Sequence, residues 1–155
     1  MTIQKTLILL KPDALQRGII GQITSRFETR GLHLSAIKMI KLDEKKCAEH
    51  YAHLTDKPFY PKLVKFMTSA PVVAMVVGGV DAVQVVRDMC GPTNARKAMS
   101  GTIRGDFSLS TQFNVIHASD SLETAEKEVK RFFDAKEIFA WNRTMDAFTA
   151  AEDEK

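Results

Sequence analysis

Residues 72–77 form the apolar run Val72-Val73-Ala74-Met75-Val76-Val77, which follows Pro71 and is ended by Gly78-Gly79. A short run without polar residues, bounded by a proline and by glycines, is typical of a buried strand. A second β-rich run, residues 6–10, has the same aliphatic character. We therefore predict that these two runs are the central strands of one sheet.

The segments around these strands have other hydrophobic periods. Ile20, Ile23 and Phe27 define a helix face that stops at Gly31, and residues 32–42 mostly alternate between apolar and polar like a strand. Further helices are expected at residues 43–54 with Asp43 as the cap, at 61–68, at 80–89 before Gly91-Pro92, and at 121–133. A last strand ends at His117, after an aperiodic stretch over residues 93–113.

In order, these elements form two split β-α-β halves. They predict an α+β fold of the ferredoxin-like βαββαβ type, with a four-stranded antiparallel sheet covered by helices on one face and a long loop before the last strand. The 155 residues with 45% hydrophobic content are enough for one full core, so we predict a single domain over residues 1–155. A long loop in so small a domain is usually functional.

Composition limits the classes of partner. No apolar run is long enough to cross a bilayer, and the start Met1-Thr2-Ile3-Gln4-Lys5 leads directly into a strand pattern, which argues against a secretory signal. Cys47 and Cys90 lack a close partner spacing and are interpreted as free thiols. The net charge of +3 suits small anions but does not by itself indicate nucleic acid. These features predict a soluble cytoplasmic protein without a membrane partner.

His117 is the first candidate for chemistry. It stands at a strand-to-helix corner, where helix N–H groups favour anions, so its imidazole is a candidate nucleophile for phosphate; taken alone, a histidine is more often one satisfied by hydrogen bonds in the core. Glu128 shares a helix face with Ser121, Ala125 and Phe132, and a half-buried carboxylate needs a partner. A carboxylate that accepts one imidazole N–H leaves the other ring nitrogen free to attack.

Cationic side chains near the same sheet edge are candidates for phosphate binding. They are Lys11 after the first strand, Arg87 late in its helix, and Arg104 in the donor-rich run at residues 101–106. Neither a Walker-type loop nor a dinucleotide-binding glycine fingerprint is present in the sequence. His50 and His53 lack further partners at metal-ligand spacing, so we do not expect a zinc site.

Three distant blocks of sequence closely resemble the nucleoside diphosphate kinase family. They are Lys11-Pro12-Asp13 with Arg17-Gly18, the run Gly101-Thr102-Ile103-Arg104-Gly105-Asp106-Phe107, and the run Asn114-Val115-Ile116-His117-Ala118-Ser119-Asp120-Ser121 with Glu128. The resemblance is in register over about residues 6–133. It implies a phosphotransferase that moves the γ-phosphoryl group of a nucleoside triphosphate, typically ATP, to a nucleoside diphosphate through phosphohistidine at His117.

The resemblance also implies roles for individual residues. His117 would be the nucleophile, Glu128 would hold its other ring nitrogen, and Ser119 would support Glu128. Phosphates and sugar would be contacted by Lys11, Tyr51, Arg104 and Asn114, further phosphate contacts would come from Arg87 and Thr93, and the base would stack on Phe59. Mg²⁺ would arrive with the nucleotide rather than bind the protein directly, with Asp120 reaching its water shell. The family's members are usually hexamers and sometimes tetramers, so the resemblance implies a homo-oligomer.

The sequence departs from the family pattern at three positions. Ala95 and Ser100 stand where the family often has proline, and Thr111 stands where many members place an apolar residue against the base. These changes leave loop rigidity, assembly and nucleotide affinity open. The alternative function is a ferredoxin-like nucleotide- or RNA-binding protein without catalysis. Nucleic acid is not expected, because Asp106 occupies the position of the first stacking aromatic of the RNA-binding motif.

Overall fold

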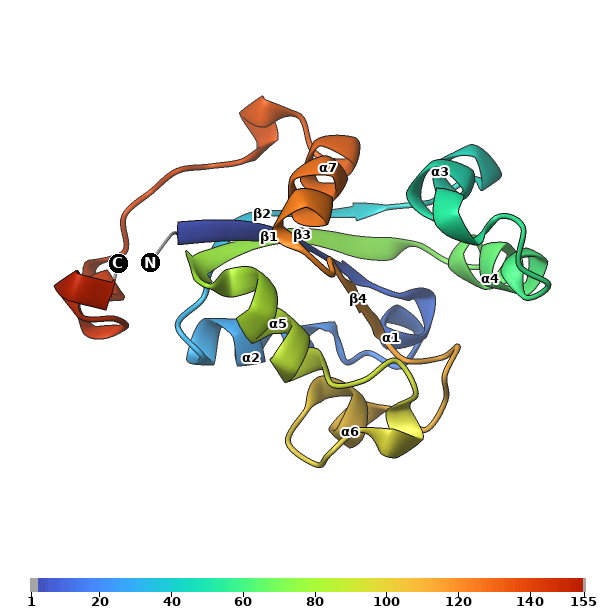
Figure 1. The fold of residues 1–155 in the computed structure, drawn as a ribbon, viewed down its shortest axis with the longest axis horizontal. Helices are drawn as coiled ribbons and strands as arrows, with labels where there is room; N and C mark the ends of the chain where they lie inside the picture. The colour runs from blue at the N-terminus through green and yellow to red at the C-terminus, as the bar shows by residue number, and fades with distance from the viewer. Residues whose placement is uncertain (1–2, 155) are drawn as a thin grey trace.

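The computed structural model describes residues 3–154 and is built around a four-stranded antiparallel sheet of order β2-β3-β1-β4 (Figure 1). The strands are β1 (Ile3–Leu10), β2 (His33–Ile40), β3 (Val72–Val80) and β4 (Ile116–Ala118). β1 pairs with β3 along its whole length and with the short β4 through Ile8, Leu9 and Leu10. The predicted ferredoxin-like α+β fold is confirmed, with β1 and β3 as the central strands.

The five predicted helices are present in the predicted order, and two short ones, α1 (Pro12–Gln16) and α6 (Ile103–Phe107), were not predicted. The predicted helices are α2 (Ile20–Thr29), α3 (Glu44–His50), α4 (Tyr60–Met67), α5 (Ala82–Cys90) and α7 (Leu122–Phe132). The Asp43 carboxylate accepts from the Lys46 N–H at 2.7 Å, and Ser121 Oγ accepts from the Thr124 N–H at 3.1 Å. The first bond begins α3 at the predicted cap, and the second makes Ser121, expected as the first helical residue, the cap of α7.

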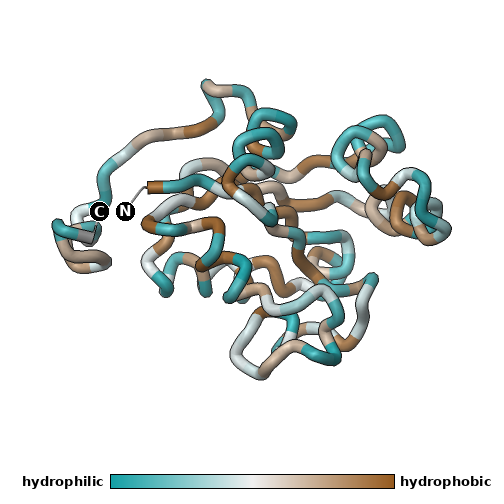
Figure 2. Tube along the Cα trace, in the orientation of Figure 1, coloured by the Kyte–Doolittle hydropathy of each residue, from teal (hydrophilic) through white to brown (hydrophobic). Residues whose placement is uncertain are grey.

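Helices cover both faces of the sheet, so the expectation of helices on one face is wrong. On one face Ile8 and Leu10 of β1 share a core with α2 and α5; on the other, Leu7 and Leu9 share a core with α4 and α7 (Figure 1). Successive strand residues point to opposite faces, and both sets are aliphatic here, so neither face can be left to water. Figure 2 shows the hydrophobic residues concentrated along these central strands.

The glycine pair after the apolar run lies inside β3 rather than ending it. A Cβ atom at Gly78 would lie 3.1 Å from the carbonyl oxygen of Gln4, and one at Gly79 would lie 3.1 Å from Leu32 Cδ2. The glycines therefore allow close approach of neighbours within the sheet. Val80, which we expected on the following helix, is consequently the last residue of the strand, and α5 begins at Ala82.

The aperiodic stretch at residues 93–113 is not structureless. It contains a 3₁₀ turn (Ala95–Lys97) and the one-turn helix α6, which is capped by Thr102 through the Gly105 N–H at 3.1 Å. Ala95 is buried, and Ile103 of α6 is fully buried in the core. Elements of three to five residues are too short to produce a hydrophobic period, which is also why α1 was not predicted.

The first strand begins at Ile3. The expectation that the chain has no secretory signal used Met1 and Thr2 as well, and these two residues lie outside the described part of the chain. Within residues 3–154, no helix combines the length and the apolar character that a membrane span requires. The remaining short turns are Ala52–Leu54, Ala135–Glu137, Thr144–Phe148 and Glu152–Glu154.

Candidate active site

A cavity of about 750 Å³ opens beside the end of β4 and lies between the α3–α4 segment and the loop that precedes β4. Its volume is within the range of small-molecule sites. The structure brings most of the predicted site residues onto its walls: Lys11, Tyr51, Phe59, Arg87, Thr93, Arg104, Asn114, His117 and Asp120. Ser119 and Glu128 do not line the cavity; Glu128 contacts His117 from behind, and Ser119 contacts Glu128.

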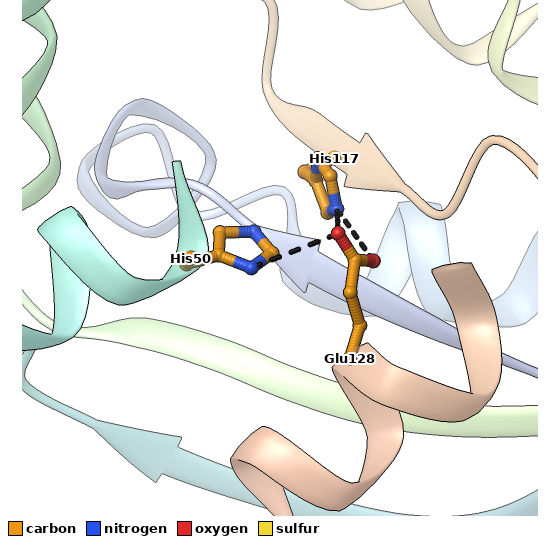
Figure 3. Close-up of side chains that lie close together, drawn as sticks. All are labelled: His50, His117 and Glu128. Carbon is orange, nitrogen blue, oxygen red and sulfur yellow. Dashed lines mark hydrogen bonds and ion pairs between the residues drawn. The ribbon is translucent and has the colours of Figure 1, made fainter. Parts of the chain in front are cut away.

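His117 and Glu128 form a hydrogen-bonded pair at the base of the cavity. Nε2 of His117 lies 3.0 Å from Glu128 Oε2 and 3.2 Å from Oε1 (Figure 3). Ser119 Oγ donates to the same carboxylate at 2.7 Å. The pairing of β4 with β1 places His117 opposite Leu9, and α7 then brings Glu128, only 5% exposed, back beneath the ring.

The electrostatics of this pair fix which imidazole nitrogen carries the proton. Burial acts to raise the pKa of the Glu128 carboxyl, but the hydrogen bonds from His117 and Ser119 and the nearby imidazoles outweigh it and hold this pKa below its usual value. Glu128 is therefore an acceptor, and Nε2 of His117 must donate. The neutral ring then keeps an unprotonated Nδ1 with its lone pair free.

His50 belongs to the same cluster, although it was not predicted as a site residue. Its ring meets the ring of His117 edge-on at 4.6 Å between centroids, and its Nδ1 lies 3.7 Å from Glu128 Oε1 (Figure 3). Burial, followed by the charge of His117, lowers the pKa of His50 to about 3, so this imidazole is neutral at physiological pH. Its position one turn after the buried Cys47, on the inner face of α3, is the signal that could have found it.

The same three side chains are close enough together to be considered as metal ligands. Their ligand atoms all lie within 4.8 Å of one another. The guanidinium of Arg131, however, donates to Nδ1 of His50 at 3.3 Å, and Glu128 is already engaged by His117 and Ser119. A cation would have to displace these bonds and sit beside a guanidinium, so the arrangement favours an oriented imidazole over a metal centre.

Cationic side chains form the wall next to His117. Nζ of Lys11 donates to Asn114 Oδ1 at 2.6 Å, and the Asn114 amide in turn donates to the Thr93 carbonyl at 2.9 Å. The Arg104 guanidinium donates at 2.7 Å to the carbonyls of Gly91 and Ile116, while Arg87 completes the wall. Burial, followed by the charge of Arg104, lowers the pKa of Lys11 to about 8. This wall is suited to a multiply charged anion.

The far end of the cavity is apolar. Phe59, half-exposed at the N-terminal end of α4, lies there with Leu54 and Leu63, and Thr111 and Gln112 line the cavity from the loop before β4. Tyr51 also contributes to the wall, and burial raises the pKa of its hydroxyl, which therefore stays protonated and able to donate. A flat apolar group attached to a polyanion would fit this distribution of side chains.

Comparison with known proteins identifies relatives over nearly the whole chain. The family model described as nucleoside diphosphate kinase matches residues 4–138. A nucleoside diphosphate kinase from Rhodopirellula baltica is 48% identical over 97% of this chain and 99% of its own length, and one from Parabacteroides distasonis is 53% identical over 88% and 89%.

Solved structures agree with the sequence comparison. A halophilic nucleoside diphosphate kinase from Halobacterium salinarum, in complex with CDP, superposes with a TM-score of 0.94 at 43% identity and covers 96% of this chain and 99% of its own. A transition-state mimic of the enzyme from Borrelia burgdorferi, with bound vanadate and ADP, has a TM-score of 0.89 at 37% identity, over 96% and 98% of the two chains.

Proposed function

The chain belongs to the nucleoside diphosphate kinase family, and we propose that it transfers the γ-phosphoryl group of ATP to a nucleoside diphosphate through a phosphohistidine at His117. One observation carries this mechanism: Nε2 of His117 is held by Glu128 inside the protein, which leaves Nδ1 unprotonated on a ring that lines a cationic cavity. An oriented neutral imidazole beside an anion-binding wall is what nucleophilic attack on phosphorus requires.

The reaction would proceed in two mirrored steps. In the first, the Nδ1 lone pair forms a bond to the γ-phosphorus while the bond from that phosphorus to the β–γ bridging oxygen breaks, and the diphosphate leaves with that electron pair. In the second, a terminal oxygen of another nucleoside diphosphate attacks the phosphorus, and the N–P bond breaks and returns its pair to Nδ1. The proton stays on Nε2 of His117, hydrogen-bonded to Glu128, in both steps.

The remaining side chains of the cavity would bind and orient the nucleotide. We assign the phosphates to Lys11, Arg87 and Arg104, with Thr93, Asn114 and the Tyr51 hydroxyl as further donors, and the base to the exposed ring of Phe59. The Phe59 ring is a flat apolar surface without hydrogen-bonding groups that could distinguish one base from another, so little discrimination among bases is expected. Thr111 adds a hydroxyl beside this end of the cavity, which is a feature of this chain.

Magnesium would enter as part of the Mg–nucleotide substrate and neutralise phosphate charge. Asp120 is the carboxylate on the cavity wall, and it accepts a hydrogen bond from Thr124 that, together with Arg87, holds its pKa below the usual value. An ionised carboxylate at this place fits the water shell of a phosphate-bound divalent cation. The buried free thiols Cys47 and Cys90 fit the cytoplasmic location that we propose for the enzyme.

The first test is incubation of the purified protein with γ-labelled ATP and Mg²⁺ in the absence of an acceptor. We expect intact-mass analysis to show one added phosphoryl group that is labile in acid and that is discharged by GDP to give GTP. An acid-stable adduct would place the group on a hydroxyl side chain instead of His117. Bound nucleotide without any adduct would support the alternative of a binding protein that lacks the chemistry.

We also propose that the chain forms a homo-oligomer, a hexamer as the family resemblance implies, with a tetramer as the alternative. β2 is an edge strand of the sheet, and on it Ile37 and Met39 are 51% and 60% exposed. An edge strand has unpaired backbone N–H and C=O groups, and with exposed apolar side chains it can pair with the same strand of a second copy.

Light scattering of the wild type at micromolar concentration is expected to give about six times the 17.3 kDa mass of the chain. Met39→Glu should reduce this mass, because it places a charge on the apolar edge of β2, whereas Lys130→Glu on the exposed side of α7 should not. A wild-type monomer, or a Met39→Glu protein of unchanged mass, would contradict assembly through this edge.

A further inference from the structure

A strained turn immediately before β4 holds Val115 in a left-handed backbone conformation, with φ of +62°. We propose that Asp13 is a positioning residue that keeps this turn closed and thereby sets Asn114 and His117 for phosphoryl transfer. The proposal rests on the proposed function, since its readout is the phosphorylation of His117. Asp13 itself does not line the cavity, so it would act only through the residues that it holds.

The backbone at Val115 is unfavourable by itself. The Ile116 N–H donates to the Asn114 carbonyl at 2.8 Å, which closes a three-residue turn around Val115. A three-residue turn with positive φ at its centre is rare, and a β-branched residue is the least suited to that region. Val115 is completely buried, so the strain must be balanced by contacts within the protein.

The segment that follows β1 supplies those contacts. The Val115 N–H donates to Asp13 Oδ2 at 3.1 Å, and the Lys11 N–H donates to the Val115 carbonyl at 2.9 Å. The N–H and the carbonyl of Val115 are thus both hydrogen-bonded to the segment after β1, the first to Asp13 and the second to Lys11. Burial raises the pKa of the Asp13 carboxyl, and the hydrogen bond from Val115 and the charge of Lys11 act in the opposite direction. Burying a carboxylate costs free energy, so its presence here calls for a structural role.

The residues on either side of Val115 belong to the phosphate wall. Asn114 binds Nζ of Lys11 at 2.6 Å, the Ile116 carbonyl accepts from Arg104 at 2.7 Å, and His117 is the next residue. If the turn relaxed to an ordinary backbone conformation, Asn114 and the start of β4 would move together. Displacements of about 1 Å in a catalytic arrangement can cost about 100-fold in rate.

The test compares Asp13→Ala, Asp13→Asn, Val115→Gly and the double variant Asp13→Ala/Val115→Gly in the single-turnover phosphorylation of His117 by ATP. We expect Asp13→Ala to slow the reaction about 10- to 100-fold and Asp13→Asn, which keeps an acceptor oxygen, to slow it about threefold at most. Glycine adopts positive φ without strain, so Val115→Gly should restore most of the rate in the Asp13→Ala background.

The rescue separates positioning from stability. Glycine at position 115 removes packing but also relieves the backbone strain, so the free energy of unfolding of each variant is measured beside its rate, and a rate that returns without a return of stability identifies positioning. Val76→Gly, at an equally buried position that lacks positive φ, is the matched control and should not rescue Asp13→Ala. Full activity of Asp13→Ala, or a folded Asp13→Ala protein whose rate Val115→Gly fails to restore, would overturn the proposal.

Two further results keep the outcome unambiguous. If the wild type forms no phosphoenzyme, the proposed function fails; if the wild type and Asp13→Ala form it equally fast, only the role of Asp13 fails. Should Asp13→Ala not fold, hydrogen exchange of the Val115 amide in the wild type and in Asp13→Asn decides the question. We expect protection in both, and exchange as fast as in exposed loops would contradict the clamp.

Discussion

Replacement of His117 by alanine is expected to abolish phosphoenzyme formation and to reduce the kinase rate on the order of 10⁴- to 10⁶-fold, the loss that follows deletion of a covalent nucleophile. No other side chain of the cavity offers a neutral nitrogen with a carboxylate on its far side within residues 3–154. Nucleotide binding should persist, because Lys11, Arg87 and Arg104 stay on the wall. Intact-mass analysis with ATP and a coupled assay with GDP measure both effects.

His33→Ala is the matched control for that substitution. His33 lies on β2, away from the cavity, where its ring meets Trp141 edge-on at 4.6 Å between centroids. Its removal should leave phosphorylation within about twofold of the wild type, as is usual for substitutions away from a site. A His117→Ala protein that still accumulates an acid-labile phosphoryl adduct would show that the nucleophile is another residue.

The pairing of His117 with Glu128 is a feature that the sequence could predict. Helical spacing places Glu128 on a face with Ala125 and Phe132, and the structure buries all three. A carboxylate on an apolar face demands a partner, and a histidine at a strand end is one of the few available. The strands were predictable for a similar reason, because aliphatic runs such as residues 72–77 have few alternatives to the centre of a sheet.

The features that the sequence did not predict depend on long-range contacts. His50 meets Glu128 only because α3 and α7 are folded over the same face of the sheet, and nothing in a local pattern indicates this proximity. The positive φ of Val115 is not predicted by residue type either, since valine avoids that conformation; the Val115 N–H is bound by Asp13, which is distant in the sequence. Helices on both faces follow from the two-sided burial of β1 and β3, which the unbroken aliphatic runs imply although helices on one face were expected.

Lys11 is expected to give the enzyme an alkaline limit. Its pKa is lowered to about 8 by burial and then by the charge of Arg104, so the amine is cationic below that pH and becomes neutral above it. Only the cation attracts the phosphates, and kcat/KM reports the free enzyme. We therefore expect kcat/KM for ATP to be level near neutral pH and, above the pKa of about 8, to fall by about tenfold per pH unit.

The neighbouring groups do not account for such a limb. Burial lowers the pKa of His50 to about 3 and raises that of Cys90 to about 11, and the pKa of Tyr51 is raised by burial as well. A decline of kcat/KM that begins near pH 8 is therefore assigned to Lys11.

Lys11→Met tests this assignment because it keeps most of the apolar stem and removes the charge. Loss of one preorganised cationic donor should lower kcat/KM about 100- to 1,000-fold near neutral pH. The remaining activity should then lack the alkaline limb, since the group that titrates is gone. Lys45→Met, at an exposed position of α3, is the control and should keep both the rate and the limb. A wild-type profile that stays level well above the pKa of about 8, or a limb that survives in Lys11→Met, would mean that another group supplies the charge lost at alkaline pH.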